Sequence, residues 1–264
     1  MRLSTLIFAP VLVLGLSAAR AASLPDTGQT LCYDGSNVLA VCSNANAGDT
    51  ATYPRQDGRF GRDAQAAKGT LPKIGAGAAG FDYTKVANNG ADVAAGTALG
   101  AGATDWACTR DNITGLLWEV KTSTATDLRA ASHQYTWYST NGATNGGNVG
   151  TNAVTNSCGT PPTLASCNTE AFIAAVNAAS GLCGYKDWRL PSLRELKTIV
   201  HYGASNLAID TTYFPNTSAF NFWSASTYVL APSDAWGIVF SDGGNNHYAK
   251  TGSTIARLVR GLQF

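Results

Sequence analysis

Six cysteines constrain this chain more than any other feature of its sequence. Their number is even, and all of them follow residue 31. Six cysteines allow 15 pairings, so the pattern alone leaves the connectivity open. Two pairs lie about ten residues apart across polar, turn-rich loops, and the two remaining cysteines must then join distant segments. We therefore predict the bonds Cys32–Cys42, Cys108–Cys183 and Cys158–Cys167.

The first residues have the pattern of a secretory signal peptide. Arg2 gives a short cationic start, residues 6–16 are apolar, and residues 17–22 are small except for Arg20 and contain an A-x-A site. We expect a signal peptide at 1–21, cleaved after Ala21. The alternative is a transmembrane anchor, which needs about 20 apolar residues, more than this run offers. The mature chain is thus expected to be exported (periplasmic, secreted or cell-surface associated), with no transmembrane segment.

Charge and cysteine spacing argue against two classes of partner. Without Arg2 and Arg20 the chain has 16 basic and 17 acidic side chains, and no basic block is visible. Nucleic-acid binding relies on clustered cations, so we expect no nucleic acid. No C-x-x-C motif or Cys/His cluster occurs in the sequence, which disfavours zinc.

Composition divides the mature chain into two parts. Residues 22–104 are rich in Gly and Ala, as in GTLPKIGAGAAG at 69–80, and bury too little apolar surface to offset their ordering entropy. We expect this N-terminal extension to pack as irregular coil on the main domain. Residues 105–264 form that domain, where β-branched and aromatic residues at 113–120 predict a strand.

Two helices and several short strands are predicted in the domain. Thr169 can cap a helix that ends at Gly181, and Ser192 with Glu195 forms a capping box for a second helix that stops near Gly203. Residues 140–167 are polar and are expected to form a long loop that is fixed by the cysteines at 158 and 167. Further strands are expected at 222–227, 236–240 and 256–260. The fold class is therefore α+β, with short antiparallel strands and long disulfide-pinned loops.

Five motifs in order resemble a known family. They lie at residues 113–119, 184–196, 222–226, 235–240 and 257–260, and 24–30 is similar to openings found in such proteins. The chain resembles the DUF1566 family, which is also named for the C-terminal domain of the Legionella collagen-like adhesin. The resemblance implies a distantly C-type-lectin-like fold, related to formylglycine-generating-enzyme-type folds.

The same resemblance implies an exported, non-catalytic binding or adhesion protein. In the adhesin the domain binds sulfated glycosaminoglycans, so a glycan or another surface protein is the expected partner. This chain has no Gly-X-Y stalk and a near-neutral charge. The rival hypothesis is a structural subunit of an extracellular assembly, built as a homo-oligomer. A secreted enzyme is a third possibility, but no G-x-S-x-G motif is present and no Cys follows Cys183.

Most of the family signature is expected to be structural. In the string 187–189, the Trp188 indole can be buried with its N–H hydrogen-bonded. Arg189 can pair with Asp187 or with Glu195. Three further tryptophans lie in apolar strands and are expected in the core; a sugar-stacking platform needs one of them exposed. Two late arginines should face opposite sides of a strand, one buried and paired. These signature residues are Trp118, Asp187, Trp188, Arg189, Glu195, Trp223, Trp236, Arg257 and Arg260.

A polar turn near the C-terminus is the candidate ligand surface. Short polar side chains, an imidazole and an aromatic ring follow one another there and could meet a glycan by hydrogen bonds and stacking. A solvated hairpin turn is the alternative interpretation. Calcium would need more oxygen ligands than one carboxylate and two amides, so no cofactor is assigned and metal binding stays open. The candidate residues are Asp242, Asn245, Asn246, His247 and Tyr248.

Overall fold

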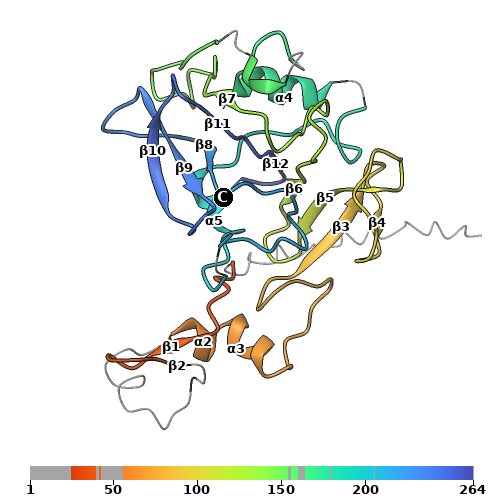
Figure 1. Ribbon diagram of the computed structural model, residues 1–264, viewed down its shortest axis with the longest axis vertical. Coiled ribbons are helices and arrows are strands. Elements are labelled where there is room, and N and C mark those ends of the chain that lie inside the picture. Colours follow the sequence, from red (N-terminus) through yellow and green to blue (C-terminus); the bar gives the residue numbers. More distant parts are fainter. Residues whose placement is uncertain are drawn as a thin grey trace, which may run out of the picture.

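A computed structural model gives the fold of this chain (Figure 1). The expected signal peptide at 1–21 lies outside the described residues. Within the described part of the chain, no helix is both long and apolar enough to cross a membrane. The structure describes residues 25–39, 42, 56–153, 156–159, 164–178, 180–204 and 206–263.

The largest sheet has five strands in the order β12-β6-β5-β3-β4, and all neighbours in it are antiparallel. Its first two strands in the chain come from the Gly/Ala-rich extension, where irregular coil was expected. They form because β3 pairs on both sides and buries the side chains of Tyr83 and Val86. The strands are β3 (Tyr83–Ala87), β4 (Asp92–Val93), β5 (Trp106–Asp111), β6 (Leu117–Glu119) and β12 (Val259–Arg260).

Two smaller sheets complete the upper body in Figure 1. A three-stranded antiparallel sheet has the order β10-β9-β8, and its register places His247 opposite Trp236. A two-stranded sheet pairs β11 with β7. These strands are β7 (Tyr135–Thr136), β8 (Asn221–Thr227), β9 (Asp234–Val239), β10 (Asn245–Ala249) and β11 (Ser253–Thr254).

The two predicted helices are present, but both are shorter than predicted. Helix α4 (Thr169–Asn177) is capped by Asn168, whose side chain accepts from Ala171 N, so the prediction of Thr169 as the cap was wrong by one residue. Thr169 instead donates its hydroxyl to Tyr138 O at 2.8 Å and accepts from Tyr138 N. Helix α5 (Leu193–Lys197) ends well before Gly203.

The start of α5 is held by the predicted capping box. Ser192 Oγ accepts from Glu195 N at 3.1 Å, and Glu195 Oε2 accepts from Ser192 N at 2.8 Å. Arg189 adds two hydrogen bonds to the same carboxylate, at 2.8 and 2.6 Å. The Glu195 side chain is fully buried, so the three hydrogen bonds that its carboxylate accepts, one from Ser192 N and two from Arg189, compensate the desolvation of its charge.

A small lobe lies below the main body in Figure 1. It contains elements that the sequence did not predict, because each is too short to show hydrophobic periodicity. The strand pair β1–β2 is antiparallel, and the helices α2 and α3 follow it. The bounds are β1 (Cys32–Tyr33), β2 (Val38–Leu39), α2 (Asp57–Phe60) and α3 (Arg62–Ala67); the 3-10 helix η1 (Asn156–Cys158) lies in the main body.

Two disulfides and a core rich in tryptophan stabilise the main body, and a third disulfide lies in the small lobe. The bonds are those predicted from spacing, Cys32–Cys42, Cys108–Cys183 and Cys158–Cys167. Buried indoles donate to carbonyls, as Trp137 Nε1 does to Ser224 O and Trp223 Nε1 to Tyr135 O, both at 2.8 Å. The fold thus has few helices, several small antiparallel sheets and loops fixed by disulfides.

Candidate functional site

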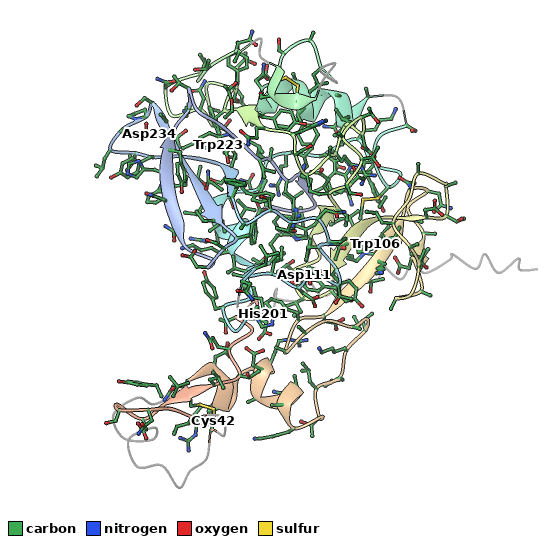
Figure 2. All side chains as sticks on the ribbon, viewed as in Figure 1. Cys42, Trp106, Asp111, His201, Trp223 and Asp234 are labelled. Carbon is green, nitrogen blue, oxygen red and sulfur yellow. A yellow bond between two sulfur atoms is a disulfide. The ribbon has the colours of Figure 1, made fainter. Side chains whose placement is uncertain are left out.

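A cluster of partly exposed aromatic and polar side chains lies on the three-stranded sheet. Trp236 on β9 and His247 on β10 are cross-strand partners, and Asp234 begins β9. Tyr228 follows β8, and its backbone N–H donates to Asp234 O at 2.9 Å. We call these four residues the aromatic patch. Figure 2 shows that Asp234 and the buried Trp223 lie in the same upper region, far from Cys42 in the small lobe.

The three rings of the aromatic patch contact one another. The rings of Tyr228 and His247 stack with centroids 4.0 Å apart and planes at 16°. Trp236 meets both of them edge-on, with centroids 5.2 Å from Tyr228 and 5.7 Å from His247. Stacked and edge-on pairs at these separations are favourable arrangements for ring quadrupoles. Each ring therefore holds the next in place before any ligand arrives.

A carboxylate orients the imidazole of the patch. His247 Nδ1 lies 2.8 Å from Asp234 Oδ2, and Ser233 Oγ donates to Asp234 Oδ1 at 3.2 Å. When Nδ1 carries the proton and donates to the carboxylate, Nε2 is left as an acceptor. Over the described residues, no group bonds to that Nε2. The His247 side chain is 37 % exposed, so part of its ring can be reached by a ligand.

The connection between β8 and β9 adds apolar surface next to the patch. Val229 and Leu230 follow Tyr228 directly and are 81 % and 80 % exposed. The turn is closed by hydrogen bonds from Ala231 N to Tyr228 O and from Asp234 N to Ala231 O. The surface thus combines aromatic rings, two aliphatic side chains and a carboxylate–imidazole pair. Such a mixture suits a ligand with both apolar faces and hydroxyl groups.

The five candidate ligand residues do not form one surface. Asp242 lies in the turn before β10, where its Oδ1 accepts from Gly244 N at 2.8 Å. Asn245 and Asn246 are exposed but belong to β10, not to the turn. Successive residues of a strand point to opposite faces, so His247 and Tyr248 are separated. Whether the five residues bind a ligand stays a prediction.

Tyr248 borders a different cavity. Its ring meets Trp223 edge-on at 6.3 Å, and it lines a pocket of about 330 Å³ together with Phe220 and Asn221. Asn221 is buried, and neither polar atom of its amide has a hydrogen-bond partner in the described structure. The amide packs against Gly237, where a Cβ would come within 2.4 Å of Asn221 Oδ1. This pocket lies beside the core and not on the aromatic patch.

The string 187–189 has structural contacts. Trp188 is buried, and its Nε1 donates to Leu182 O at 3.0 Å. Asp187 pairs with Arg260 Nε at 2.7 Å, and this contact lowers the pKa of the Asp187 carboxyl. Arg189 pairs with Glu195 rather than with Asp187. The signature therefore joins α5 to the C-terminal strand β12.

The two late arginines differ in burial, as predicted. Arg260 lies at the surface, with its guanidinium 3.6 Å from the centroid of Tyr185. Arg257 is fully buried and donates from Nη2 to Thr217 Oγ1 at 2.8 Å. We expected a paired arginine, but no carboxylate forms an ion pair with Arg257 in the described structure. Three phenylalanine rings surround it instead, and burial lowers its pKa to about 10.

Of the four tryptophans in the signature, only Trp236 is partly exposed; Trp118, Trp188 and Trp223 are buried. Sequence reasoning placed Trp236 in the core and missed Tyr228 and Asp234. The alternation of residue types along β9 does not show which end of the strand is exposed. Burial at each end depends on which other segments cover the sheet. The turn at 241–244 was a signal that could have linked Trp236 to His247. A hairpin closed by this turn places these two residues opposite each other.

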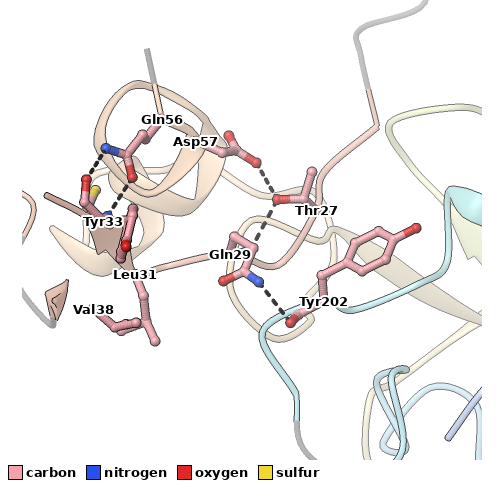
Figure 3. Close-up of a pocket in the computed structure, with 9 residues that line it drawn as sticks. Thr27, Gln29, Leu31, Tyr33, Val38, Gln56, Asp57 and Tyr202 are labelled. Carbon is pink, nitrogen blue, oxygen red and sulfur yellow. Dashed lines mark hydrogen bonds between the residues drawn. The ribbon is translucent and has the colours of Figure 1, made fainter. Parts of the chain in front are cut away.

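A cleft of about 700 Å³ lies in the small lobe (Figure 3). Its lining includes Leu31, Tyr33 and Val38, and it reaches Tyr202 of the main body. Gln29 Nε2 spans the junction by donating to Tyr202 O at 2.9 Å. The segments 40–41 and 43–55, which follow Val38 in sequence, lie outside the described residues.

The geometry does not assemble an acyl-transfer triad at the patch. A serine nucleophile would have to bond to the imidazole, as a triad requires. The hydroxyl of Ser233 donates to Asp234 instead, on the other side of the carboxylate. The Ser233 hydroxyl therefore does not bond to the His247 imidazole.

A comparison with protein families matches one segment of the chain. A family model described as the Lcl C-terminal domain covers residues 107–260, more than half of the 264 residues. The matched segment runs from within β5 to the end of β12, and it includes the whole aromatic patch. No curated protein and no solved structure matches the chain.

Proposed function

Because the chain belongs to the Lcl C-terminal domain family, we propose that it is an exported, non-catalytic binding protein that recognises a glycan through the aromatic patch. The observation that carries this proposal is the partly exposed set of packed rings beside the Asp234–His247 pair. Three disulfides favour an oxidising compartment, because such bonds are rare in reducing cytosol. A C-type-lectin-like relationship is part of the same proposal, supported by the small sheets and disulfide-pinned loops.

Sugar rings match the chemistry of the patch. A pyranose has a face of C–H groups that can pack on an aromatic ring, and hydroxyls at its edge that can bond to polar side chains. Trp236 offers the ring, and His247 Nε2 offers an acceptor whose orientation is set by Asp234. The rings are already packed on one another, so little side-chain entropy is lost on binding.

Charge makes a neutral glycan the better candidate. The patch contains one carboxylate, Asp234, and neither lysine nor arginine. Lys250 lies nearby in sequence, but it is buried and its ammonium donates to Asn145 O and Asn148 O. A sulfated chain would meet no exposed cation among these residues. We therefore expect neutral sugars to bind in preference to sulfated glycosaminoglycans.

A glycan array tests this function. The oxidised wild-type protein should bind a subset of neutral glycans, and Trp236→Ala should abolish that signal. Phe220→Ala is the matched control, because Phe220 is an exposed aromatic residue outside the patch. Silence toward every glycan on the array, or equal binding by Trp236→Ala, would refute the proposal. Binding confined to sulfated glycans would refute the preference for neutral sugars.

A further inference from the structure

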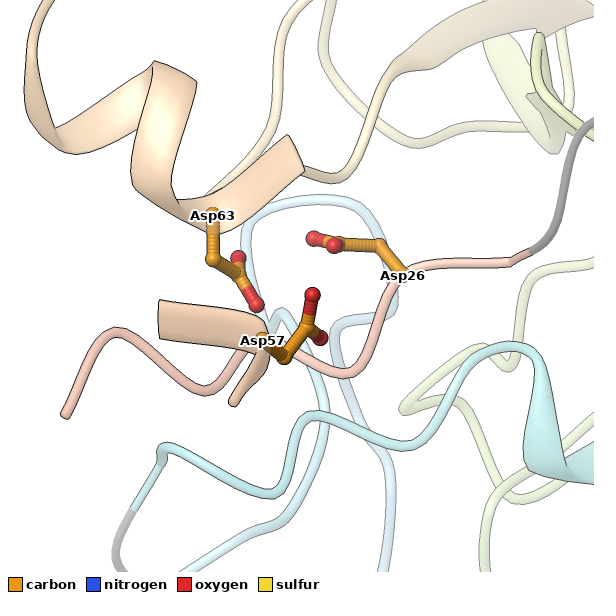
Figure 4. A group of neighbouring side chains, drawn as sticks. All are labelled: Asp26, Asp57 and Asp63. Carbon is orange, nitrogen blue, oxygen red and sulfur yellow. The ribbon is translucent and has the colours of Figure 1, made fainter. Parts of the chain in front are cut away.

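Three aspartates meet where the small lobe joins the N-terminal segment (Figure 4). Asp26 lies in the extended segment before β1, Asp57 is the first residue of α2, and Asp63 lies in α3. One carboxylate oxygen from each lies within 4.8 Å of the others. We call these residues the aspartate cluster. It lies outside residues 107–260, so the proposed glycan site does not depend on it.

Two of the three carboxylates are buried, and one of these has no donor. Asp63 is fully buried, and its Oδ1 accepts from Gly80 N at 2.8 Å. Thr27 Oγ1 donates to Asp57 and lies 3.4 Å from Asp63 Oδ2. Asp26 is 94 % buried, since 6 % of its surface is exposed, yet within the described structure its Oδ2 receives no hydrogen bond. A buried carboxylate oxygen without a donor is costly, and the Asp26 side chain to which it belongs points toward Asp57 and Asp63 (Figure 4).

Two glycines create the space that the carboxylates occupy. A Cβ on Gly80 would come within 2.3 Å of Asp26 Oδ2, and a Cβ on Gly61 would come within 1.6 Å of Asp57 Oδ1. Both contacts are shorter than real Cβ atoms show, so any other residue at either position would displace a carboxylate. The backbone is therefore shaped to hold the acidic groups close together rather than to separate them.

The charges of the cluster are only partly compensated. Arg62 lies nearby, but its Nε donates to Gly80 O at 2.9 Å, and its buried Nη2 bonds to no group in the described structure. The three side chains repel one another when all are ionised, because their carboxylate oxygens lie within 4.8 Å of one another. Asp26 and Asp63 could bond to each other only if one of them held a proton. The cluster therefore has two ways to avoid repulsion, which are a shared proton or a bound cation.

We infer that the aspartate cluster binds one divalent cation of the calcium type. Calcium takes oxygen ligands at about 2.3–2.6 Å, and oxygens within 4.8 Å of one another need only a small adjustment of the side chains to contact one ion. The Thr27 hydroxyl is a further oxygen at the same place. The cluster contains no His or Cys, the ligands that zinc and other softer metals prefer.

Such an ion would tie the N-terminal segment to the small lobe. Asp26 precedes β1, whereas Asp57 and Asp63 begin or lie in the helices that follow the strand pair. One ion would thus join segments about 30 residues apart, alongside the Cys32–Cys42 disulfide of the same lobe. The role is structural, and binding should raise the thermal stability of the folded state, which alone has the complete ligand set.

Calorimetric titration of CaCl₂ into the oxidised, chelator-treated full chain tests this inference. We expect one calcium per chain and a higher thermal midpoint with calcium. Asp63→Asn and Asp57→Asn should each weaken calcium binding by at least about tenfold, since each removes one charged ligand. Asp92→Asn removes an exposed carboxylate in β4, outside both proposed sites, and should leave calcium binding unchanged. Near-ultraviolet circular dichroism checks that every variant is folded.

A proton shared between Asp26 and Asp63 predicts the opposite results. In that case no heat would be seen with CaCl₂ at about 10 mM, above the range of extracellular calcium modules. Asp26→Asn would then raise the thermal midpoint, because the amide removes the buried acid without needing a cation. Either result would overturn the inference, and Mg²⁺ binding as tight as Ca²⁺ binding would overturn the assignment to calcium. None of these outcomes bears on glycan binding.

Discussion

Two tryptophans of the three-stranded sheet have different surroundings. Trp223 is fully buried and donates from Nε1 to Tyr135 O. Trp236 is partly exposed and contacts Tyr228 and His247 only through ring edges. The sequence around both is apolar, so residue type alone does not distinguish them. Their different burial predicts different consequences of the same substitution.

Trp236→Ala should change binding much more than stability. We expect at least a tenfold weaker affinity for the glycan and a loss of no more than about 1 kcal/mol in the free energy of unfolding, because the ring is not in the core. Trp223→Ala should cost about 3–5 kcal/mol, the usual range for a buried tryptophan. Urea unfolding and a binding titration on both variants measure the difference. If Trp236→Ala lowered the free energy of unfolding as much as Trp223→Ala does, the placement of Trp236 at the surface would be contradicted.

The Glu195 carboxylate should contribute more stability than any exposed ion pair. Glu195→Ala leaves Arg189 and the Ser192 amide without their acceptor, and we expect a loss of about 3–5 kcal/mol. Asp187→Ala breaks a pair at the surface and should cost less than about 1 kcal/mol. Denaturant unfolding of the two variants gives the comparison. Similar losses would show that burial does not set the strength of these pairs.

At the scale of elements, local signals were easier to predict than long-range pairing. The capping box of α5 and the cysteine spacing are short-range features, and both were predicted correctly. Strands β3 and β5 were missed because their stability comes from each other and not from a local pattern. For the same reason the sequence could suggest His247 as a site residue but not its partners Tyr228 and Asp234, which meet it only after the sheet forms.

The disulfides should differ in their contribution according to loop length. Cys108–Cys183 closes a separation of 75 residues, and Cys158–Cys167 closes one of 9. In the chain-entropy model, removing the first should cost about 4–5 kcal/mol and removing the second about 2–3 kcal/mol. Paired Cys→Ala variants, compared by urea unfolding, test this order. The reverse order would show that native contacts outweigh the entropy of the unfolded chain.

Lys250, which holds the loop at 139–150, should make the free energy of unfolding depend on pH in the alkaline range. Its ammonium donates to Asn145 O and Asn148 O and lies 3.8 Å from the ring centroid of Trp137. Burial lowers its pKa from 10.5 to about 8, and Asp234 partly opposes this change. At a pH between these two pKa values, Lys250 is protonated in the unfolded chain and deprotonated in the folded chain. The Lys250 contribution therefore makes the free energy of unfolding rise with pH across this window.

Lys250→Met should remove that part of the slope. Urea unfolding at about pH 7.5 and about pH 9.5, on either side of most of the transition, compares the variant with wild type. Lys186→Met, at an exposed position, serves as the control. An identical slope in wild type and Lys250→Met would contradict the lowered pKa of Lys250.

At the scale of the whole molecule, the two proposed sites lie in different regions. The aromatic patch belongs to the family segment at 107–260, whereas the aspartate cluster belongs to the N-terminal part. Figure 1 shows the corresponding sheet and lobe at separate ends of the molecule. Recognition and structural reinforcement can therefore be changed independently. Variants of one site should leave the other intact, which allows each proposal to fail without the other.

Chemical-shift mapping by NMR tests the central claim most directly. A glycan selected on the array is titrated into the oxidised, isotope-labelled protein, and the indole Nε1–H of each tryptophan is followed. The account predicts that the Trp236 indole and the backbone of His247 shift most, while the buried indoles of Trp118 and Trp223 change little. Shifts centred on the pocket around Tyr248 and Phe220, with Trp236 unchanged, would contradict it.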